Sequence, residues 1–202
     1  MEAVFIRHGE SEANLAGVIQ GRSDHRLSER GREQALRTAT ALAAFEPYRI
    51  YTSPLLRARE TAEIINRRHN AALVVLPDLI EYNLGEFEGR TWNEIVAGRP
   101  GLVEDLKRGV PFHHLAAGAE TDEAADVRGQ RVLDEIVHSG LPRVIVVAHL
   151  GILDRIIRRA LAEYIPGPTE FSGPLNNCSI TTLLIHPFTS KVIKLNDVSH
   201  LK

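Results

Sequence analysis

Short apolar runs alternate with segments of helical periodicity along most of the chain. The runs expected to form buried strands are residues 1–6, 49–52, 73–76 and 144–148. The segments in which apolar residues recur every three or four positions begin near residues 28, 54, 121 and 150. Two final apolar runs, 179–185 and 191–195, are expected to pair as a hairpin. The run at 144–148, VIVVA, is the most apolar, so we expect it near the centre of a sheet.

Strands that alternate with helices predict an α/β fold. We expect three layers, α/β/α, with a mostly parallel mixed sheet in the middle and antiparallel pairing where the final hairpin joins its edge. Residues 85–118 are rich in Gly, Pro and His and have weak periodicity, which suits a lid or insert over one end of the sheet. We therefore expect a single domain over residues 1–202.

Two serines mark expected helix starts. Ser28 is followed by an acidic residue in the first turn, a pattern typical of an N-cap. Ser53 is expected to cap the next helix, with Pro54 at its first position. This second helix therefore begins where the strand at 49–52 ends.

Composition excludes several classes of protein. Of the 202 residues 44% are hydrophobic, enough for a substantial core, and the net charge of -2 favours neither nucleic acid nor an acidic membrane as a partner. Cys178 is the only cysteine, which excludes an internal disulfide and a multi-cysteine zinc site. The apolar runs are too short to span a bilayer, and Glu2 and Arg7 interrupt any secretion signal. We expect a cytoplasmic protein without a membrane partner.

Polar side chains of one chemical kind follow the ends of the predicted strands. Arg7 and His8 follow the first strand, and His149 follows the strand at 144–148. Arg57 lies in the first turn of the helix after the second strand, where amide groups attract anions, and Glu81 comes soon after the third strand. The carboxyl ends of parallel strands share one edge, so we expect these groups to meet. Guanidinium groups, an imidazole nucleophile and a carboxylic acid suit phosphoryl transfer without a metal ion or cofactor.

Each of these residues also has a simpler explanation when taken alone. A single histidine after a strand is usually bound to backbone, and a single arginine usually pairs with a surface acid. Asp78 or Glu86 would serve in place of Glu81 on position alone. Other chemistries lack their motifs: there is no phosphate-binding G-x-x-x-x-G-K-[ST] loop, no G-x-G-x-x-G and no G-x-S-x-G. His113 and His114 are adjacent, which is poor spacing for holding one metal ion from a helix.

Several motifs resemble those of one known family, the histidine phosphatase or phosphoglycerate mutase-like superfamily. Residues 5–11, FIRHGES, match its R-H-G-E-[ST] signature. Residues 53–62, SPLLRARETA, look like its S-P-L-x-R-A-x-x-T-A motif. Residues 79–89, LIEYNLGEFEG, are similar to its L-x-E-x-x-x-G-x-x-E-G motif, which selects Glu81 over the other two acids. The likeness covers most of the chain and implies a phosphoglycerate mutase-like fold.

The resemblance also implies a role for each candidate residue. His8 would be the nucleophile that forms a phosphohistidine, with Arg7, Arg57 and His149 around the phosphoryl oxygens. Glu81 would protonate the leaving group and later act as the base for water. Further substrate-binding candidates from matching segments are Asn14, Gln20 and Gly21.

Gly9 follows the expected nucleophile directly. A glycine there would let the chain turn sharply after the first strand. Such a turn would let Arg7 and His8, which face opposite ways in a continuing strand, address one phosphoryl group.

One departure from the family pattern concerns Leu150. The family most often has glycine after the second histidine, and its mutases continue His-Gly-Asn-Ser, whereas residues 149–152 read HLGI. Together with the chain length, Leu150 favours the small phosphatase branch. We therefore expect a metal-independent phosphomonoesterase acting on a small soluble phosphate ester. The alternatives are a cofactor-dependent phosphoglycerate mutase and a non-catalytic phosphate-binding module.

Substrate recognition is expected in two further places. The C-terminal residues 195–201 resemble the tails of small family members, which makes His200 a candidate substrate contact, with a disordered tail as the alternative. Within residues 85–118, basic side chains would meet a carboxylate or a second phosphate, or else form a solvated face: Arg99, Lys107, Arg108, His113 and His114. An exposed edge strand near the C-terminus would also allow a homodimer.

Overall fold

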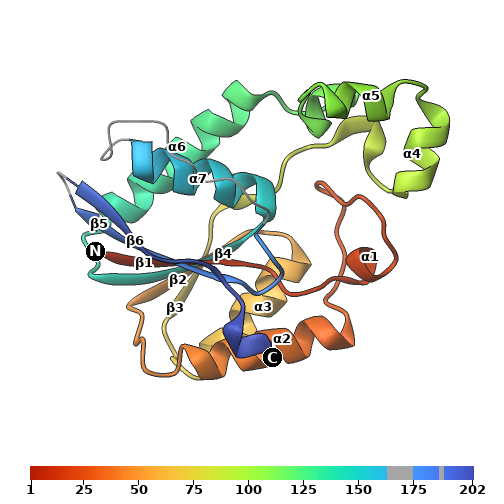
Figure 1. The fold of residues 1–202 in the computed structure, drawn as a ribbon. Helices are drawn as coiled ribbons and strands as arrows, with labels where there is room; N and C mark the ends of the chain where they lie inside the picture. The colour runs from red at the N-terminus through yellow and green to blue at the C-terminus, as the bar shows by residue number, and fades with distance from the viewer. Residues whose placement is uncertain (163–174, 187–188) are drawn as a thin grey trace.

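A six-stranded mixed sheet forms the middle layer of the computed structural model, which describes residues 1–162, 175–186 and 189–202 (Figure 1). The strands are β1 (Glu2–Arg7), β2 (Arg49–Thr52), β3 (Ala72–Val75), β4 (Arg143–Ala148), β5 (Ile180–His186) and β6 (Thr189–Asp197). Their order is β3-β2-β4-β1-β5-β6. Strands β1 to β4 are parallel, and β5 pairs antiparallel with both β1 and β6. The prediction of a mostly parallel mixed sheet with an antiparallel edge is confirmed.

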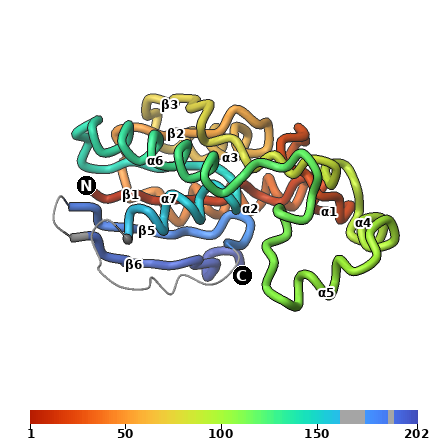
Figure 2. The backbone as a smooth tube through the Cα atoms, turned by 90° about the horizontal axis from the view of Figure 1, so that it is seen from above, coloured from red at the N-terminus to blue at the C-terminus, as the bar shows by residue number. Residues whose placement is uncertain are grey.

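Helices cover both faces of the sheet because its strands are apolar on both sides. Helices α6 (Asp122–His138) and α7 (Leu150–Ala162) pack on one face, and α2 (Glu29–Ala41) and α3 (Leu56–Asn66) pack on the other (Figure 1 and Figure 2). In β4, Val144 and Val146 belong to the apolar cluster shared with α6 and α7, whereas Ile145 and Val147 belong to the cluster shared with α2 and α3. This alternation follows from the two-residue period of a strand and places β4 among the central strands, as predicted.

The two predicted helix starts have different outcomes. Ser28 caps α2, since its Oγ accepts a hydrogen bond from Gly31 N at 3.0 Å. In contrast, α3 has Leu55 as its N-cap, without a side-chain cap. The prediction for Ser53 was wrong because its hydroxyl is held at the edge of the sheet, 2.7 Å from His149 Nε2.

Residues 85–118 lie beyond the carboxyl ends of β1 and β4 (Figure 1 and Figure 2). They contain α4 (Trp92–Gly98), α5 (Leu102–Lys107) and two short 3₁₀ turns, and an isolated β-bridge between Leu84 and Ala119 joins their two ends. A small apolar cluster, separate from the two beside the sheet, holds them together; its buried members are Phe87, Ile95, Leu102, Leu115 and Ala116. The remaining short helix, α1 (Glu12–Leu15), follows β1 at the same end of the sheet.

Candidate active site

The carboxyl ends of β1 and β4 bring two imidazoles together. His8 follows β1 and His149 follows β4, and these neighbouring parallel strands place Arg7 opposite Ala148. The two ring centroids are 5.1 Å apart, with the ring planes tilted by 57°. Both side chains are buried. The strand-end argument therefore located this pair from sequence.

The His8 ring has a defined tautomer. Its Nδ1 lies 2.7 Å from the carbonyl oxygen of Gly9, and because a carbonyl only accepts, Nδ1 carries the proton and donates it. Burial, followed by the positive charges of Arg7 and Arg57, lowers the pKa of His8 well below its ordinary value. The imidazole is therefore neutral at neutral pH and has a free lone pair on Nε2.

His149 is held by a residue whose contact the sequence did not predict. Its Nε2 lies 2.7 Å from Ser53 Oγ, while its Nδ1 is buried without a hydrogen-bond partner among the described residues. Burial, with the charge of Arg57 as the next cause, lowers the pKa of His149 well below its ordinary value. The strand-end argument does predict Ser53 at this edge, since it directly follows β2, but not its contact with His149.

Acid is expected to destabilise the fold because His8 and His149 are neutral in it. The unfolded chain binds their protons once the pH falls below the ordinary pKa of 6.5, whereas the folded protein does not. Their stabilisation is complete above pH 6.5 and is lost as the pH falls through and below that value. Each histidine should lower the free energy of unfolding by about 1.4 kcal/mol between pH 8 and pH 5.5. Urea unfolding at the two pH values measures this decrease. In His149→Asn the decrease between pH 8 and pH 5.5 should be smaller by about 1.4 kcal/mol. A decrease equal to that of the wild type would contradict the assignment.

Two guanidinium groups lie close to the imidazoles, that of Arg57 buried and that of Arg7 partly buried. Arg57, 1% exposed, donates from Nη1 to Ser23 O at 2.9 Å and from Nη2 to Gly21 O at 2.8 Å. Arg7 donates from Nη1 to Leu175 O at 2.6 Å. In both arginines Nε is buried and has no partner among the described residues, which leaves an N–H donor for a ligand. Burial lowers the pKa of Arg7 and lowers that of Arg57 to about 10, so both remain cationic at neutral pH.

The Glu81 carboxylate lies at the N-terminus of α7. Its Oε1 accepts from Tyr82 N at 2.9 Å and Ile152 N at 3.1 Å, and its Oε2 accepts from Gly151 N at 3.0 Å. A Cβ at Gly151 would lie 2.7 Å from both Glu81 Oε1 and Tyr82 Cδ2. Glycine at 151 therefore permits the close approach of the carboxylate to the helix.

The other two acids considered from sequence are engaged elsewhere. Asp78 forms two hydrogen bonds with Arg131, at 2.7 and 3.0 Å. Glu86 accepts from Ala117 N at 3.0 Å, within the segment that contains α4 and α5. Glu81 is the one of the three that contacts α7, the helix that begins directly after His149, in agreement with the motif comparison.

Helix amides contribute less to the site than the sequence suggested. At the start of α3, Leu56 N donates to Asp24 Oδ1 at 2.7 Å, and at the start of α7 two amides donate to Glu81. Carboxylates of the chain thus occupy positions where an anionic ligand was expected. The positive charge available to a ligand comes from the two guanidinium groups instead.

Gly9 meets a second requirement besides the predicted turn. It does not have a positive φ, but a Cβ there would lie 2.6 Å from the carbonyl oxygen of Gly31 in α2. Its N–H donates to Thr61 Oγ1 at 3.0 Å, which attaches the segment to α3. Glycine therefore lets the loop after β1 pack directly against a helix backbone, and the sharp turn expected from sequence stays a prediction.

Three further candidates, Asn14, Gln20 and Gly21, are hydrogen-bonded to residues next to the predicted site. Asn177 Nδ2 donates to His8 O at 2.9 Å and lies 3.4 Å from Asn14 Oδ1. Gln20 Oε1 accepts from Ser11 Oγ at 2.8 Å. Gly21 contributes the carbonyl that holds Arg57 and has φ +50°, a conformation that favours glycine. Asn177 had no sequence signal, since its position depends on a segment distant in the chain.

His200 does not join this group. Its Nε2 lies 2.9 Å from Thr38 Oγ1 of α2, and burial lowers the pKa of its imidazole. The C-terminal turn packs on α2, and this hydrogen bond ties the ring to that helix. We therefore leave His200 out of the proposed site.

One group of side chains has the residue types of a metal site. His113 Nε2 and His114 Nε2 lie 2.8 and 3.0 Å from the two carboxylate oxygens of Asp122. Arg155, however, donates to the same carboxylate. A metal ion bound there would lie beside a guanidinium group, which is electrostatically unfavourable, so we assign no metal to it.

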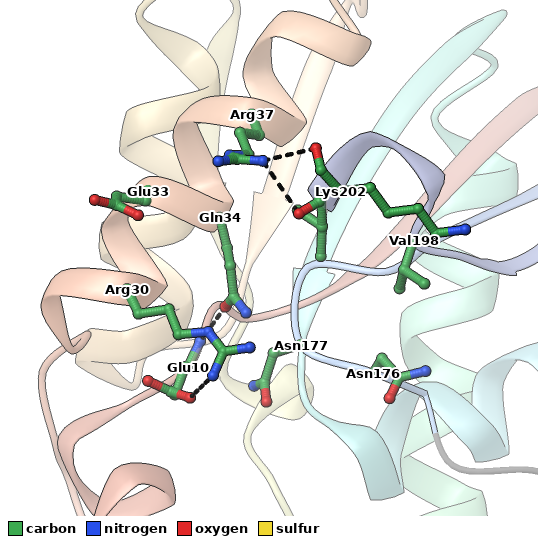
Figure 3. A pocket seen from close by; sticks show the side chains of 10 residues that line it. Glu10, Arg30, Glu33, Gln34, Arg37, Asn176, Asn177, Val198 and Lys202 are labelled. Carbon is green, nitrogen blue, oxygen red and sulfur yellow. Dashed lines mark hydrogen bonds and ion pairs between the residues drawn. The ribbon is translucent and has the colours of Figure 1, made fainter.

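Two cavities lie near the catalytic end. One of about 460 Å³ lies between α2 and the C-terminal turn, where Arg30 faces Glu10 and Arg37 donates to the carbonyl of Lys202 (Figure 3). None of the five predicted catalytic side chains lines it. The other, of about 310 Å³, is lined by two of the residues predicted for the site, Glu81 and Leu150.

Comparison with known proteins identifies the family. The model of the Histidine phosphatase superfamily (branch 1) matches residues 3–198. The chain belongs to this superfamily. The resemblance inferred from the motifs of this histidine phosphatase is thereby confirmed.

Individual relatives of this histidine phosphatase have related names. It is 33% identical to the metal-independent phosphoserine phosphatase of Arabidopsis thaliana, over 99% of this chain and 83% of the relative. It is 32% identical to a probable phosphoglycerate mutase of Photorhabdus laumondii, over 90% of this chain and 83% of the relative. Its fold matches a mycobacterial glucosyl-3-phosphoglycerate phosphatase solved with VO3, with a TM-score of 0.83 and 27% identity, over 96% of this chain and 98% of that one. The predicted phosphoglycerate mutase-like fold is confirmed.

Proposed function

We propose that this histidine phosphatase hydrolyses a small phosphate monoester without a metal ion, through a phosphohistidine on His8. One observation carries the proposal: a buried, neutral His8 lies beside the buried Arg57 and the partly buried Arg7, and among the described residues neither arginine Nε has a hydrogen-bond partner. A phosphate ester supplies the oxygens that these donors lack, and it presents phosphorus to the free nitrogen.

In the first step, His8 Nε2 attacks phosphorus and the bond from phosphorus to the ester oxygen breaks. Arg7, Arg57 and His149 hold the three remaining phosphoryl oxygens, and the N–H of Leu150 donates to one of them. Leucine has the same amide as the glycine usual at this position, so that contact does not depend on the side chain. Glu81 delivers a proton from Oε2, the oxygen that accepts only one N–H, to the departing alcohol.

In the second step, a water molecule replaces the alcohol. The Glu81 carboxylate takes a proton from this water as its oxygen attacks phosphorus, the bond between Nε2 and phosphorus breaks, and inorganic phosphate leaves. The two guanidinium groups keep their positive charge throughout and stabilise the transferring phosphoryl group in both steps. Glu81 ends the cycle protonated and ready for the next ester.

Release of inorganic phosphate from a panel of phosphomonoesters in excess EDTA tests this function. We expect turnover to be unaffected by EDTA, because arginine supplies the positive charge. Loss of turnover in EDTA, restored by a divalent cation, would contradict the metal-independent mechanism. Phosphate-induced thermal stabilisation without turnover would indicate a binding module instead.

A phosphoglycerate mutase is the second candidate, because one relative of 32% identity has that name. A mutase shares the attack by His8 but returns the phosphoryl group to its substrate. Isomerisation of phosphoglycerate that requires a bisphosphoglycerate primer would favour it. Release of inorganic phosphate without isomerisation would favour the phosphatase.

We further propose that residues 85–118 act as a lid and that the protein works in the cytoplasm without nucleic acid. Among the described residues, no helix combines the length and apolar character needed to cross a bilayer. The net charge of -2 offers no general attraction for nucleic acid.

Strand β6 is an edge strand with Ile193 and Leu195 exposed, which supports a homodimer through that edge. Sedimentation as a monomer at micromolar concentration would exclude the dimer.

A further inference from the structure

The cavity of about 310 Å³ beside Glu81 has a mainly apolar wall. Tyr82, Leu84 and Phe112 contribute to it from the segment after β3, and Leu150 contributes from the first turn of α7. Tyr82 is buried, and the other three residues are partly exposed. A ligand group of this size would therefore meet two aromatic rings and two leucine side chains.

This cavity lies where the alcohol part of an ester must leave. Glu81 lines it, and Glu81 is the proposed donor of the leaving-group proton. Gly151, whose N–H holds Glu81 Oε2, lines it as well. The ester oxygen must come within hydrogen-bond distance of that carboxylate. The carbon atoms attached to this oxygen then extend into the cavity.

The charged residues of the wall are already paired with each other or with neighbours. Asp154 Oδ2 accepts from Arg158 Nε at 2.8 Å. Arg155 donates to Asp126 at 3.3 Å and also to Asp122.

His113 and Tyr82 join the same arrangement. His113 Nε2 lies 2.8 Å from Asp122, and the Tyr82 hydroxyl donates to Asp122 at 3.3 Å. Among the described residues of this wall, no cation is therefore without a counter-charge. A carboxylate or second phosphate on the substrate would have to break one of these pairs or lose its hydration without compensation.

We propose that this cavity selects phosphate monoesters of uncharged apolar or aromatic alcohols, with Leu150, Leu84 and Phe112 as the residues that determine specificity. The proposal rests on the proposed phosphatase function. It differs from the expectation that basic side chains of residues 85–118 bind a second anionic group. His113 and His114 are held by Asp122, and Arg108 pairs with Asp105.

A series of esters with alcohols of similar acidity tests the proposal: ethyl, butyl and 2-phenylethyl phosphate, with O-phosphoserine as the charged comparison. We expect kcat/KM to rise at least about tenfold from ethyl to 2-phenylethyl phosphate, because each buried methylene improves binding severalfold. O-phosphoserine should be used less well than 2-phenylethyl phosphate. A higher kcat/KM for O-phosphoserine, or equal kcat/KM values for the three alkyl esters, would overturn the proposal. The phosphatase function would still hold in that case if turnover depended on His8.

Variant Leu84→Ala separates the cavity from the chemistry, because Leu84 lines the cavity and has no part in the proposed phosphoryl-transfer steps. It should lower kcat/KM for 2-phenylethyl phosphate by about tenfold and change that for ethyl phosphate less than about twofold. Leu36→Ala is the matched control, since Leu36 lies half-exposed on α2 and does not line this cavity. An equal loss for both esters in Leu84→Ala would overturn the proposal, and urea unfolding of both variants checks that they are folded.

Binding to a His8→Ala variant distinguishes failure of the inference from failure of the proposed function. Calorimetry would compare 2-phenylethylphosphonate with methylphosphonate, neither of which can be hydrolysed as an ester. If the larger compound binds at least about tenfold more tightly, the cavity assignment is supported. If, in addition, the wild-type protein turns over no ester, only the phosphatase function is rejected. Equal affinities overturn the cavity assignment whatever the turnover.

Discussion

Replacing His8 with alanine is expected to lower kcat for phosphomonoester hydrolysis by at least about 10⁴-fold. The substitution removes the Nε2 lone pair that forms the bond to phosphorus, and among the described side chains His149, the other imidazole at this end of β1 and β4, is hydrogen-bonded through Nε2 to Ser53. Phosphate release from 4-nitrophenyl phosphate in EDTA measures the effect. A kcat within tenfold of the wild-type value would reject His8 as the nucleophile.

The matched control for His8→Ala is His138→Ala. His138 lies at the exposed end of α6, where its Nδ1 bonds to Asp134 O at 2.7 Å, so its loss should leave kcat unchanged. Acid quenching would destroy a phosphohistidine, so the intermediate should be trapped in alkali instead. Wild-type protein should then carry phosphate in stoichiometric proportion and the His8→Ala protein none. Labelling of the variant at another residue would contradict the mechanism.

Replacing Glu81 with glutamine is expected to lower kcat for alkyl phosphates by about 10²- to 10⁴-fold, the usual range for loss of a general acid. The loss should be much smaller when the leaving group is 4-nitrophenol, because that anion departs without a proton. Steady-state kinetics with 2-phenylethyl phosphate and 4-nitrophenyl phosphate would show this difference. Equal losses for the two esters would mean that Glu81 acts by binding rather than by proton transfer.

The structural role of Glu81 requires a control of its own. Glutamine keeps one oxygen that can accept from the α7 amides but loses the second charged acceptor, so we expect a decrease of about 1 kcal/mol in the free energy of unfolding. Glu86→Gln is the matched variant, since Glu86 also accepts a backbone N–H but lies outside the catalytic group. It should lose comparable stability and little activity.

The strand-end argument succeeded because it depends on periodicity and direction, both of which are local properties of the chain. Apolar runs of four to six residues identified β1, β2, β3 and β4, and a shared direction brought His8 and His149 to one edge. The argument was less reliable at helix starts. Ser53 has the local pattern of a cap, yet its hydroxyl forms a hydrogen bond with His149, which follows β4 and lies 96 positions away in the chain.

Glycines show the same limit. From sequence, Gly9 suggested a turn because glycine is commonly needed for one. A second requirement comes from the backbone of Gly31, 2.6 Å from where a Cβ would be. Such a contact between separate segments leaves no periodic pattern in the sequence.

The sequence by itself determined the family, the α/β layers and the identity of the five side chains proposed for catalysis. Motif residues and hydrophobic periodicity are properties of short stretches of sequence and can be recognised there. Only the tertiary structure decided how those side chains are held and which charges remain free for a substrate. Glu81 is held by amides of α7, about 70 residues away, and the charges around the cavity are neutralised by pairs between α7 and the first turns of α6. An ion pair depends on distance in space and not on separation along the chain. Composition and spacing therefore do not predict which charges around the cavity are paired, and hence which substrates the cavity accepts.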